Sequence, residues 1–451
     1  MGVTSNRNSK NEEVAGESLV VSLSRQKPKN ISLGGINMRK LIVSVAAALL
    51  MASSLSTVAK AAEEVTIPFG AFWVQTGVFK SFGVNSKAVY EAFVEELHAK
   101  GGIKLKDGRI GKISTKFYDS GCKAEEALAV VRKMASVDNV LLAVGPTCSS
   151  ALEPVFGILQ KKLGDPSDTG LQFMVFSDTS AKPGLGKISP WGFRASPNES
   201  AMYLAVMKHL KAIGVKTVAF GFEDNFAHST ATYKVMRKHA LATGLEVKAD
   251  QGWHYDDTQF STQARKIKAT KADALIISAH PFTTCGFMRE AKRQRIKQKI
   301  LIGLTSTSSI ETLQGCPKEV ESMIIPTAFA PVNDEARRIA KIVAKKGGFM
   351  DIHSAAVWEV MTVLVQALEN TDVQLKPETL AADRRKIRDY VANVGTWKGL
   401  LGTVVSNNQG SATHDGDVSK PWLLAQAKGS EWGIYWRPKA LGGTGPLKGV
   451  E

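Results

Sequence analysis

From Val65 onward, short runs rich in β-branched and aromatic residues alternate with longer amphipathic segments. In the first such unit, the run 65–72 is followed by Val89, Phe93 and Leu97, which recur at helical spacing until Gly101. A strand, a helix and a second strand in succession form the βαβ unit, in which the crossover helix covers a parallel sheet. The alternation therefore predicts an α/β protein with mainly parallel sheets.

The alternation falls into two series, because the pattern restarts after Pro197. A chain of 451 residues, 44% of them hydrophobic, can build two or three folded units, and we expect two doubly wound lobes. The expected strands cover 65–72, 112–118, 140–144, 173–176, 217–222, 245–253, 274–278, 300–303, 323–326, 399–406 and 422–426. The expected helices after the first cover 124–136, 151–162, 202–213, a segment ending at 243, 260–270, 284–294, 334–346, 352–369 and 378–393.

The sequence from Met38 has the form of an export signal. Arg39 and Lys40 precede the apolar run 41–55, and Ala59-Lys60-Ala61 has the A-x-A form of a cleavage site. The run is shorter than the roughly 20 apolar residues of a spanning helix, so cleavage near Ala61 is favoured over a retained anchor. We expect a leader without assigned function at 1–37, a signal peptide at 38–61 and a periplasmic mature protein.

Charge and motif content argue against nucleic acid, metals and catalysis. The net charge is +16, but the 58 Lys and Arg residues are spread along the chain instead of forming one basic arm. Phosphate-binding loops, zinc-protease helices, nucleophile elbows and dinucleotide fingerprints are absent from the sequence. The 8 histidines form no i, i+4 pair of metal-ligand type, and we expect most of them at the surface or at helix ends. We expect no catalytic residues, no metal and no cofactor.

Polar residues follow two of the predicted strands. The strand 140–144 runs through Gly145-Pro146 to Ser149 and Ser150 at the start of the next helix. A helix start offers unpaired N–H groups, so these serines can bind a carboxylate; the alternative is that they only cap the helix. Thr179 and Ser180 follow the strand 173–176 in the same way, at the strand end where open α/β sheets bind ligands. An ordinary turn is the alternative there.

With these segments in order, the chain resembles the branched-chain amino-acid (Leu/Ile/Val) binding proteins of ABC importers, which have the type I periplasmic binding protein fold. The resemblance covers most of residues 64–426. It is carried by Thr76-Gly77 with Phe82-Gly83, Ala99-Lys100-Gly101-Gly102-Ile103, Tyr118-Asp119-Ser120-Gly121-Cys122, and Gly145-Pro146-Thr147-Cys148-Ser149-Ser150.

The resemblance implies two lobes joined by three crossing strands near Ser196, Pro326 and Thr403. Lobe 1 would comprise 64–195 and 327–402, and lobe 2 would comprise 196–326 and 403–451. A first-lobe disulfide between Cys122 and Cys148 is implied, and Cys285 with Cys316 is expected as an additional bridge in the second lobe. The implied contacts with the ligand are Phe82, Ser149, the segment Thr179-Ser180-Ala181, Phe226, and His280-Pro281-Phe282.

Two departures from the family pattern concern the ligand. Ala181 stands where amino-acid binders have a threonine, and Thr305 stands where they have the acid that pairs with the ligand ammonium. A buried ammonium without its carboxylate would lose about 3 kcal/mol or more. We therefore expect a small aliphatic or aromatic carboxylate, held by Ser149 and Ser150, with an uncharged tail between Phe82, Phe226 and Phe282.

The resemblance also implies partners. We expect a monomer that delivers its ligand to an ABC permease in the inner membrane, with no nucleic acid bound. Three alternatives remain at this point: a ligand sensor with the same fold, a binder of a small amide or urea, and an exported enzyme.

Overall fold

The computed structural model describes residues 62–197, 199–408 and 414–450. The leader 1–37, the signal peptide 38–61 and the cleavage site at Ala61 therefore lie outside the described residues. Among the residues described, no helix is long and apolar enough to cross a membrane.

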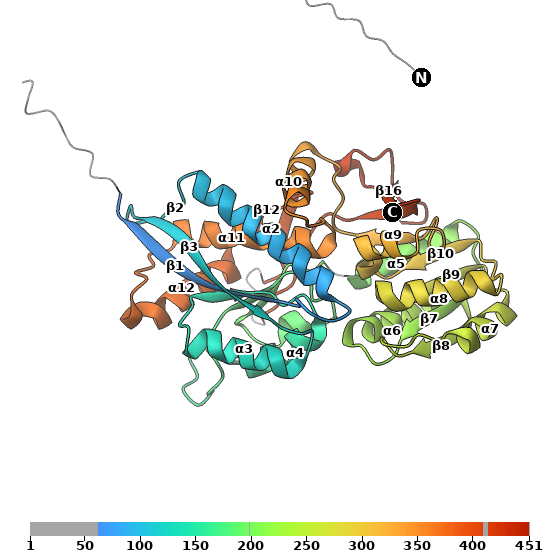
Figure 1. The fold of residues 1–451 in the computed structure, drawn as a ribbon, viewed down its shortest axis with the longest axis horizontal. Coiled ribbons are helices and arrows are strands. Elements are labelled where there is room, and N and C mark those ends of the chain that lie inside the picture. The colour runs from blue at the N-terminus through green and yellow to red at the C-terminus, as the bar shows by residue number, and fades with distance from the viewer. Residues whose placement is uncertain (1–61, 198, 409–413, 451) are drawn as a thin grey trace, which may run out of the picture. The chain divides into compact units, whose positions relative to one another are not determined.

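The first sheet has six strands in the order β2-β3-β1-β4-β5-β6. Its central strand β1 pairs in parallel with β3 and β4, and only the short β2 is antiparallel. Helices α2 and α11 lie side by side on one face, and α3 and α4 cover the other (Figure 1). The strands are β1 (Glu64–Trp73), β2 (Ile103–Lys104), β3 (Ile110–Asp119), β4 (Leu142–Val144), β5 (Val175–Ser177) and β6 (Gly192–Arg194). The helices are α2 (Lys80–Ala99), α3 (Ala124–Ser136), α4 (Ser149–Ile158), η1 (Leu185–Lys187), α10 (Asp334–Lys345), α11 (Ile352–Asn370), η3 (Pro377–Thr379) and α12 (Leu380–Asn393).

The second sheet has seven strands in the order β16-β15-β11-β10-β9-β7-β8. The five strands from β11 to β8 are parallel, and β15 and β16 add an antiparallel edge. The strands are β7 (Thr217–Glu223), β8 (Glu246–Trp253), β9 (Ala274–Ser278), β10 (Ile300–Gly303), β11 (Ile324–Thr327), β15 (Leu423–Lys428) and β16 (Glu431–Trp436). The helices are α5 (Glu199–Ala212), α6 (Ala227–Ala242), α7 (Ser261–Thr270), α8 (Pro281–Arg293), η2 (Thr305–Thr307), α9 (Ile310–Gly315) and η4 (Lys439–Leu441).

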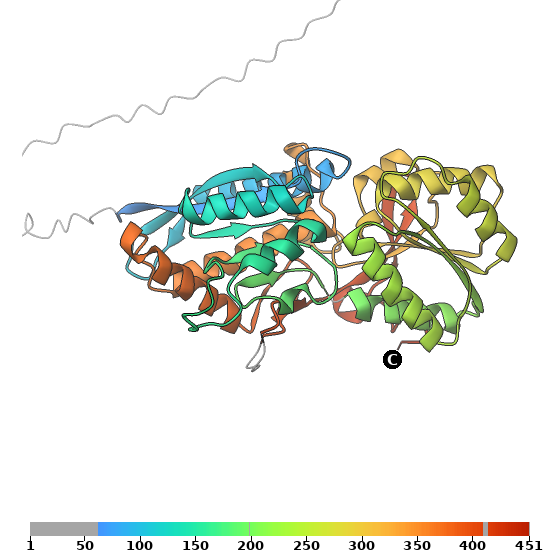
Figure 2. The ribbon, with the colours of Figure 1, turned by 90° about the horizontal axis from the view of Figure 1, so that it is seen from below.

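Each lobe has its own core. The first lobe is built around one cluster in which Phe69 and Phe72 of β1 pack against residues of α2, α3, α4 and α11. The second lobe has a separate cluster on each face of its sheet, with α5 and α6 on one face and α7, α8 and α9 on the other (Figures 1 and 2). Helices on both faces of a mainly parallel sheet define the doubly wound α/β class, so the predicted fold class is confirmed.

The chain passes between the lobes three times, and the third crossing differs from the prediction. The first crossing lies near Ser196 and the second at 328–333, close to the positions expected. However, β13 (Thr403–Ser406) pairs with β12 (Thr396–Lys398) and β14 (Val418–Ser419) in a third, three-stranded sheet, and Val404 and Val418 pack in the first core. The crossing therefore lies at 420–422, and the boundary at Thr403 is wrong.

A buried ion pair stands beside this third crossing. The Lys420 ammonium lies 2.7 Å from the Glu359 carboxylate of α11, and their side chains are 3% and 4% exposed. The second carboxylate oxygen of Glu359 accepts a hydrogen bond from the Leu400 N–H at 3.0 Å. The crossing segment is thus held to the first lobe by a pair of charges removed from water.

Each lobe contains one disulfide. Cys122 pairs with Cys148 in the first lobe and Cys285 with Cys316 in the second, each with the two Cα atoms 5.4 Å apart. Both expected bridges are therefore present. Neither bridge connects the two lobes.

Most of the predicted elements agree with the structure to within a few residues. The segments 124–136 and 274–278 coincide with α3 and β9. The predicted helix 151–162 is instead α4, which begins two residues earlier and ends at Ile158. Because α4 begins at Ser149, only Thr147 and Cys148 separate the Gly145-Pro146 turn from the helix start that was predicted to bind the ligand.

Candidate functional site

A cleft between the lobes collects side chains from the carboxyl ends of both sheets. About 290 Å³ of space in the cleft, including its solvent-open side, is not filled by protein atoms. Its lining consists of Phe79, Phe82, Thr147, Cys148, Ser149, Thr179, Ala181, Phe226, His228, His280, Ser306 and His353. None of these described lining residues is Asp, Glu, Lys or Arg.

Five helices begin at this cleft. The lining residues include the first residue of α4, the second residues of α6 and α11, and the residues that precede α2 and α8. For α2, α4, α6 and α8 this follows from the topology, since a crossover helix starts where a parallel strand ends, whereas α11 follows α10. A helix start carries a partial positive charge and unpaired N–H groups. Asp351 already accepts hydrogen bonds at the start of α11, so the other four helix starts favour a negatively charged ligand.

A close backbone approach positions the start of α2. Gly83 lies against the Val74 carbonyl that follows β1, and a Cβ atom on this residue would collide with that oxygen. Only glycine permits this contact without a shift of the helix. The contact places Phe79 and Phe82 at the cleft.

The first-lobe wall presents hydroxyl groups. Ser149 accepts a hydrogen bond from the Lys182 N–H at 3.1 Å, so its own proton remains available to a ligand. The Thr179 hydroxyl is buried and has no hydrogen-bond partner among the described residues. A buried hydroxyl without a partner is costly, and a bound ligand would satisfy it.

Asp178 lies behind this wall and is fully buried. One of its oxygens accepts hydrogen bonds from Ser86 at 2.9 Å and Thr147 at 2.7 Å, and the other has no partner. Burial raises the pKa of this carboxyl above its usual range and outweighs these hydrogen bonds. Asp178 therefore holds the Thr147 hydroxyl in place from behind the wall.

Aromatic rings close the cleft from both lobes. The Phe79 ring lies 4.8 Å from Phe226 and 5.1 Å from His280, measured between ring centroids. On the first-lobe side, the Phe82 and His353 rings lie 4.5 Å apart. These rings supply apolar surface for the body of a ligand and exclude water from its polar ends.

Two second-lobe histidines are each supported by a buried carboxylate. His228 donates from Nε2 to Glu199 at 2.9 Å, and His280 donates from Nδ1 to Glu223 at 2.6 Å. Burial disfavours ionisation of Glu199 and Glu223, but the facing histidine charges and hydrogen bonds outweigh it, so both pKa values are lowered. The two carboxylates therefore stay ionised and fix the orientation of the rings.

His353 stands on the other side of the cleft, at the start of α11. Asp351 caps this helix and accepts hydrogen bonds from the backbone N–H groups of His353 and Ser354 at 2.9 and 3.0 Å. The same carboxylate lies 3.5 Å from His353 Nδ1. Burial disfavours the charged imidazole, but the Asp351 charge outweighs it and raises the pKa of His353.

The structure brings six of the predicted site residues together in the cleft: Phe82, Ser149, Thr179, Ala181, Phe226 and His280. Four others lie outside it. Phe282 is 47% exposed, because its position on α8 turns it away from the cleft. Ser180 is buried and donates to the carbonyls of Pro146 and Thr147, at 3.0 and 2.9 Å.

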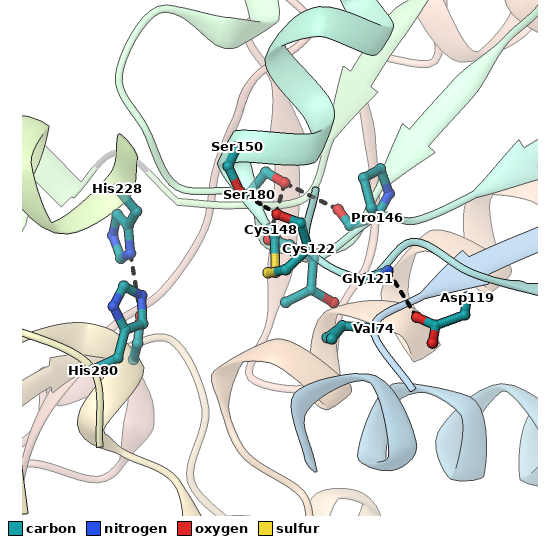
Figure 3. The surroundings of a disulfide bond; sticks show 12 residues. Val74, Asp119, Gly121, Cys122, Pro146, Cys148, Ser150, Ser180, His228 and His280 are labelled. Carbon is teal, nitrogen blue, oxygen red and sulfur yellow. Dashed lines mark hydrogen bonds between the residues drawn. A yellow bond between two sulfur atoms is a disulfide. The ribbon is translucent and has the colours of Figure 1, made fainter. Parts of the chain in front are cut away.

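Ser150 and Thr305 also have structural partners. Ser150 donates to the carbonyl of Cys122 at 2.7 Å, beside the first disulfide (Figure 3). Thr305 donates to the buried carboxylate of Glu199. An acid is therefore present beside Thr305, where the sequence indicated none, but it does not line the cleft, and His228, which bonds to it, does.

Six lining residues were not predicted: Phe79, Thr147, Cys148, His228, Ser306 and His353. The expectation that most histidines lie at the surface or at helix ends missed the shared location of His228, His280 and His353. Their sequence signal is weak: His353 lies in the first turn of the predicted helix 352–369, but the predicted helix 284–294 begins four residues after His280, and no start was predicted for the helix that contains His228. Figure 3 shows His228 above His280, across from the Cys122–Cys148 disulfide.

Comparisons with known proteins agree with this geometry. A model of a periplasmic binding protein family matches residues 66–431. Among solved structures, the leucine-binding protein LivK of Thermotoga maritima is 16% identical with a TM-score of 0.69, covering 82% of this chain and 97% of its own. LivJ of Streptococcus pneumoniae, in complex with isoleucine, is 17% identical with a TM-score of 0.68, covering 82% and 98%.

A third structure has a ligand without an amino group. A solute-binding protein of R. palustris, in complex with benzoate, is 16% identical with a TM-score of 0.68, covering 82% of this chain and 96% of its own. The same fold thus holds both an amino acid and a carboxylic acid in these two relatives.

Proposed function

Because the chain belongs to the periplasmic binding protein family, we propose that it is the periplasmic substrate-binding component of an ABC importer and that it binds a small amphipathic carboxylate. The ligand lies between the lobes, and lobe closure presents the complex to an inner-membrane permease. The protein acts as a monomer after removal of its signal peptide. It binds the ligand without chemical conversion and requires no cofactor.

The observation that supports this proposal is the charge pattern of the cleft. Five helix starts face it, and no carboxylate lines it among the described residues. The ligand carboxylate binds at the start of α4, where the Ser149 and Thr179 hydroxyls supply hydrogen bonds. Each such bond to a charged group contributes about 1.5 to 3 kcal/mol. The rings of Phe79, Phe82 and Phe226 contact the apolar part.

The same pattern disfavours an α-ammonium group. Glu199 is the acid nearest to the position expected from amino-acid binders, but Thr305, Thr232 and His228 already bond to its two oxygens. An ammonium would enter a site with positive helix ends and no free carboxylate, so it would lose the compensation that buried charges need.

A matched pair of ligands tests this proposal. Leucine and 4-methylpentanoate have the same carbon skeleton and differ only in the amino group. We expect 4-methylpentanoate to bind the purified protein at least tenfold more tightly than leucine in a calorimetric titration, with Thr179→Val weakening both. Tighter binding of leucine would overturn the assignment and indicate that Glu199 pairs with the ligand ammonium. In that case Glu199→Gln should abolish the preference for leucine.

A further inference from the structure

The second-lobe wall of the cleft has donors that a simple monocarboxylate would not use. His228, His280 and Ser306 line this wall, opposite Ser149 and Thr179 on the first lobe. The rings of His228 and His280 lie 5.6 Å apart between centroids. A ligand that bridges the lobes therefore meets polar groups at both ends.

The hydrogen bonds of these histidines show which atoms are free. His280 uses Nδ1 on Glu223, and its Nε2 has no hydrogen-bond partner among the described residues. His228 uses Nε2 on Glu199, and its Nδ1 lies 3.2 Å from the Ser306 hydroxyl. When both ring nitrogens of His228 are protonated, Nδ1 donates to the Ser306 hydroxyl and the serine proton is free for the ligand; in the neutral ring Ser306 donates to Nδ1 instead.

The carboxylates behind the rings determine the charge that the ligand meets. Glu223 is 1% exposed and also accepts hydrogen bonds from the His280 N–H at 3.0 Å and the Thr283 hydroxyl at 2.6 Å. Glu199 is 4% exposed and bonds to Thr232 and Thr305 in addition to His228. Neither carboxylate lines the cleft, so the ligand meets the imidazole side of each pair.

A metal ion does not explain this arrangement. Both nitrogens of His228 already have protein partners. The one group of three His, Asp or Glu side chains with ligand atoms close enough for a metal, among the described residues, is His254, Asp256 and Asp257 in a separate loop. The wall formed by His228, His280 and Ser306 can instead bind an anion when each imidazole carries both protons, because each ring then donates one N–H to its buried carboxylate and has a second N–H to donate.

We infer that the ligand carries a second anionic group, as in a short-chain dicarboxylate, which binds to His280 Nε2 and the Ser306 hydroxyl. The first carboxylate remains at Ser149 and Thr179, so this inference rests on the proposed function. The ligand backbone between the two anionic groups contacts Phe79 and Phe226.

Ligands of equal length test this inference. Calorimetric titration compares butanedioate with butanoate and pentanedioate with pentanoate. We expect at least one dicarboxylate to bind tenfold or more tightly than its monocarboxylate, equivalent to about 1.4 kcal/mol. Equal or tighter binding of the monocarboxylates overturns the inference and leaves the proposed function intact. Binding of leucine but of none of the acids overturns both.

Variants locate the second anion. His280→Gln and Ser306→Ala are each expected to reduce the dicarboxylate preference to threefold or less. His254→Gln is the matched control, because His254 is an exposed histidine outside the cleft, and it should leave the preference unchanged. Far-ultraviolet circular dichroism shows whether each variant is folded. If His280→Gln does not fold, the result for Ser306→Ala decides whether the inference holds. An unchanged preference in folded Ser306→Ala and His280→Gln overturns the inference.

Discussion

The buried pair of Glu359 and Lys420 offers a sharp test of how the third crossing is held. In Lys420→Met, the Glu359 carboxylate keeps one hydrogen bond, from the Leu400 N–H, and loses its counter-charge. Removing one partner of a buried pair costs about 3 to 5 kcal/mol. Unfolding entropy is about 2.1 cal/mol/K per residue. For the unit 62–451, treated as one cooperative transition, the melting temperature should therefore fall by roughly 4 to 6 °C.

The double variant distinguishes charge burial from packing. Glu359→Gln combined with Lys420→Met removes both charges, and we expect it to recover most of the stability lost in Lys420→Met. Urea denaturation followed by tryptophan fluorescence measures each step. Lys182→Met is the control, since the Lys182–Glu153 pair is 27% and 43% exposed and contributes no more than about 1 kcal/mol. A loss in Lys420→Met no larger than in this control would refute the reasoning.

Three further variants test other parts of the fold. Replacing Cys285 and Cys316 with serine opens a loop with a sequence separation of 31. In the chain-entropy model this should lower the free energy of unfolding by about 3.7 kcal/mol, measured by urea denaturation. A decrease of less than about 1 kcal/mol would contradict this expectation. Asp178→Asn should gain stability relative to the wild type as the pH rises above the usual aspartate pKa. Because burial raises the pKa of Asp178 in the native state, its protonated carboxyl stabilises the wild type at low pH. This stabilisation is lost as the pH rises and the carboxyl deprotonates. Melting curves from pH 4 to 8 that run parallel for the two proteins would contradict this. Gly83→Ala should lower the melting temperature because its Cβ meets the Val74 carbonyl, whereas Gly157→Ala, where the added Cβ meets nothing, should not.

Helices and strands could be predicted where their own residues carry the hydrophobic pattern. The run 274–278 is apolar throughout and became β9, buried on both faces of its sheet. The strand β6 was missed because its three residues, Gly192–Arg194, include no β-branched residue and no apolar run, unlike the equally short β4 and β5. The third crossing was misplaced because the predicted strand 399–406 has the same local pattern whichever sheet it joins. Its partners β12 and β14 are contacts that the pattern does not encode.

The site divides in the same way. Ser149 and Thr179 were predicted because each follows a buried strand, where the parallel topology itself places ligands. His228 and His353 were missed because their roles depend on tertiary contacts: Glu199 reaches His228 from another helix, and His353 meets the Phe82 ring from a distant part of the chain. Phe282 was included because the resemblance implied the whole stretch His280-Pro281-Phe282, but the helix turns Phe282 outward.

The division of the first lobe between two distant stretches of chain affects the order in which the protein can be completed. Helix α11, which fills the first core beside α2, is made only after the whole parallel part of the second sheet. During synthesis from the N-terminus, the face of the first sheet that α2 and α11 share is therefore covered by α2 alone until the second sheet's parallel strands have been made. Such a face is where premature association occurs in large proteins. Until α11 arrives, the first lobe is the part of the nascent chain that most needs to be kept apart from other chains.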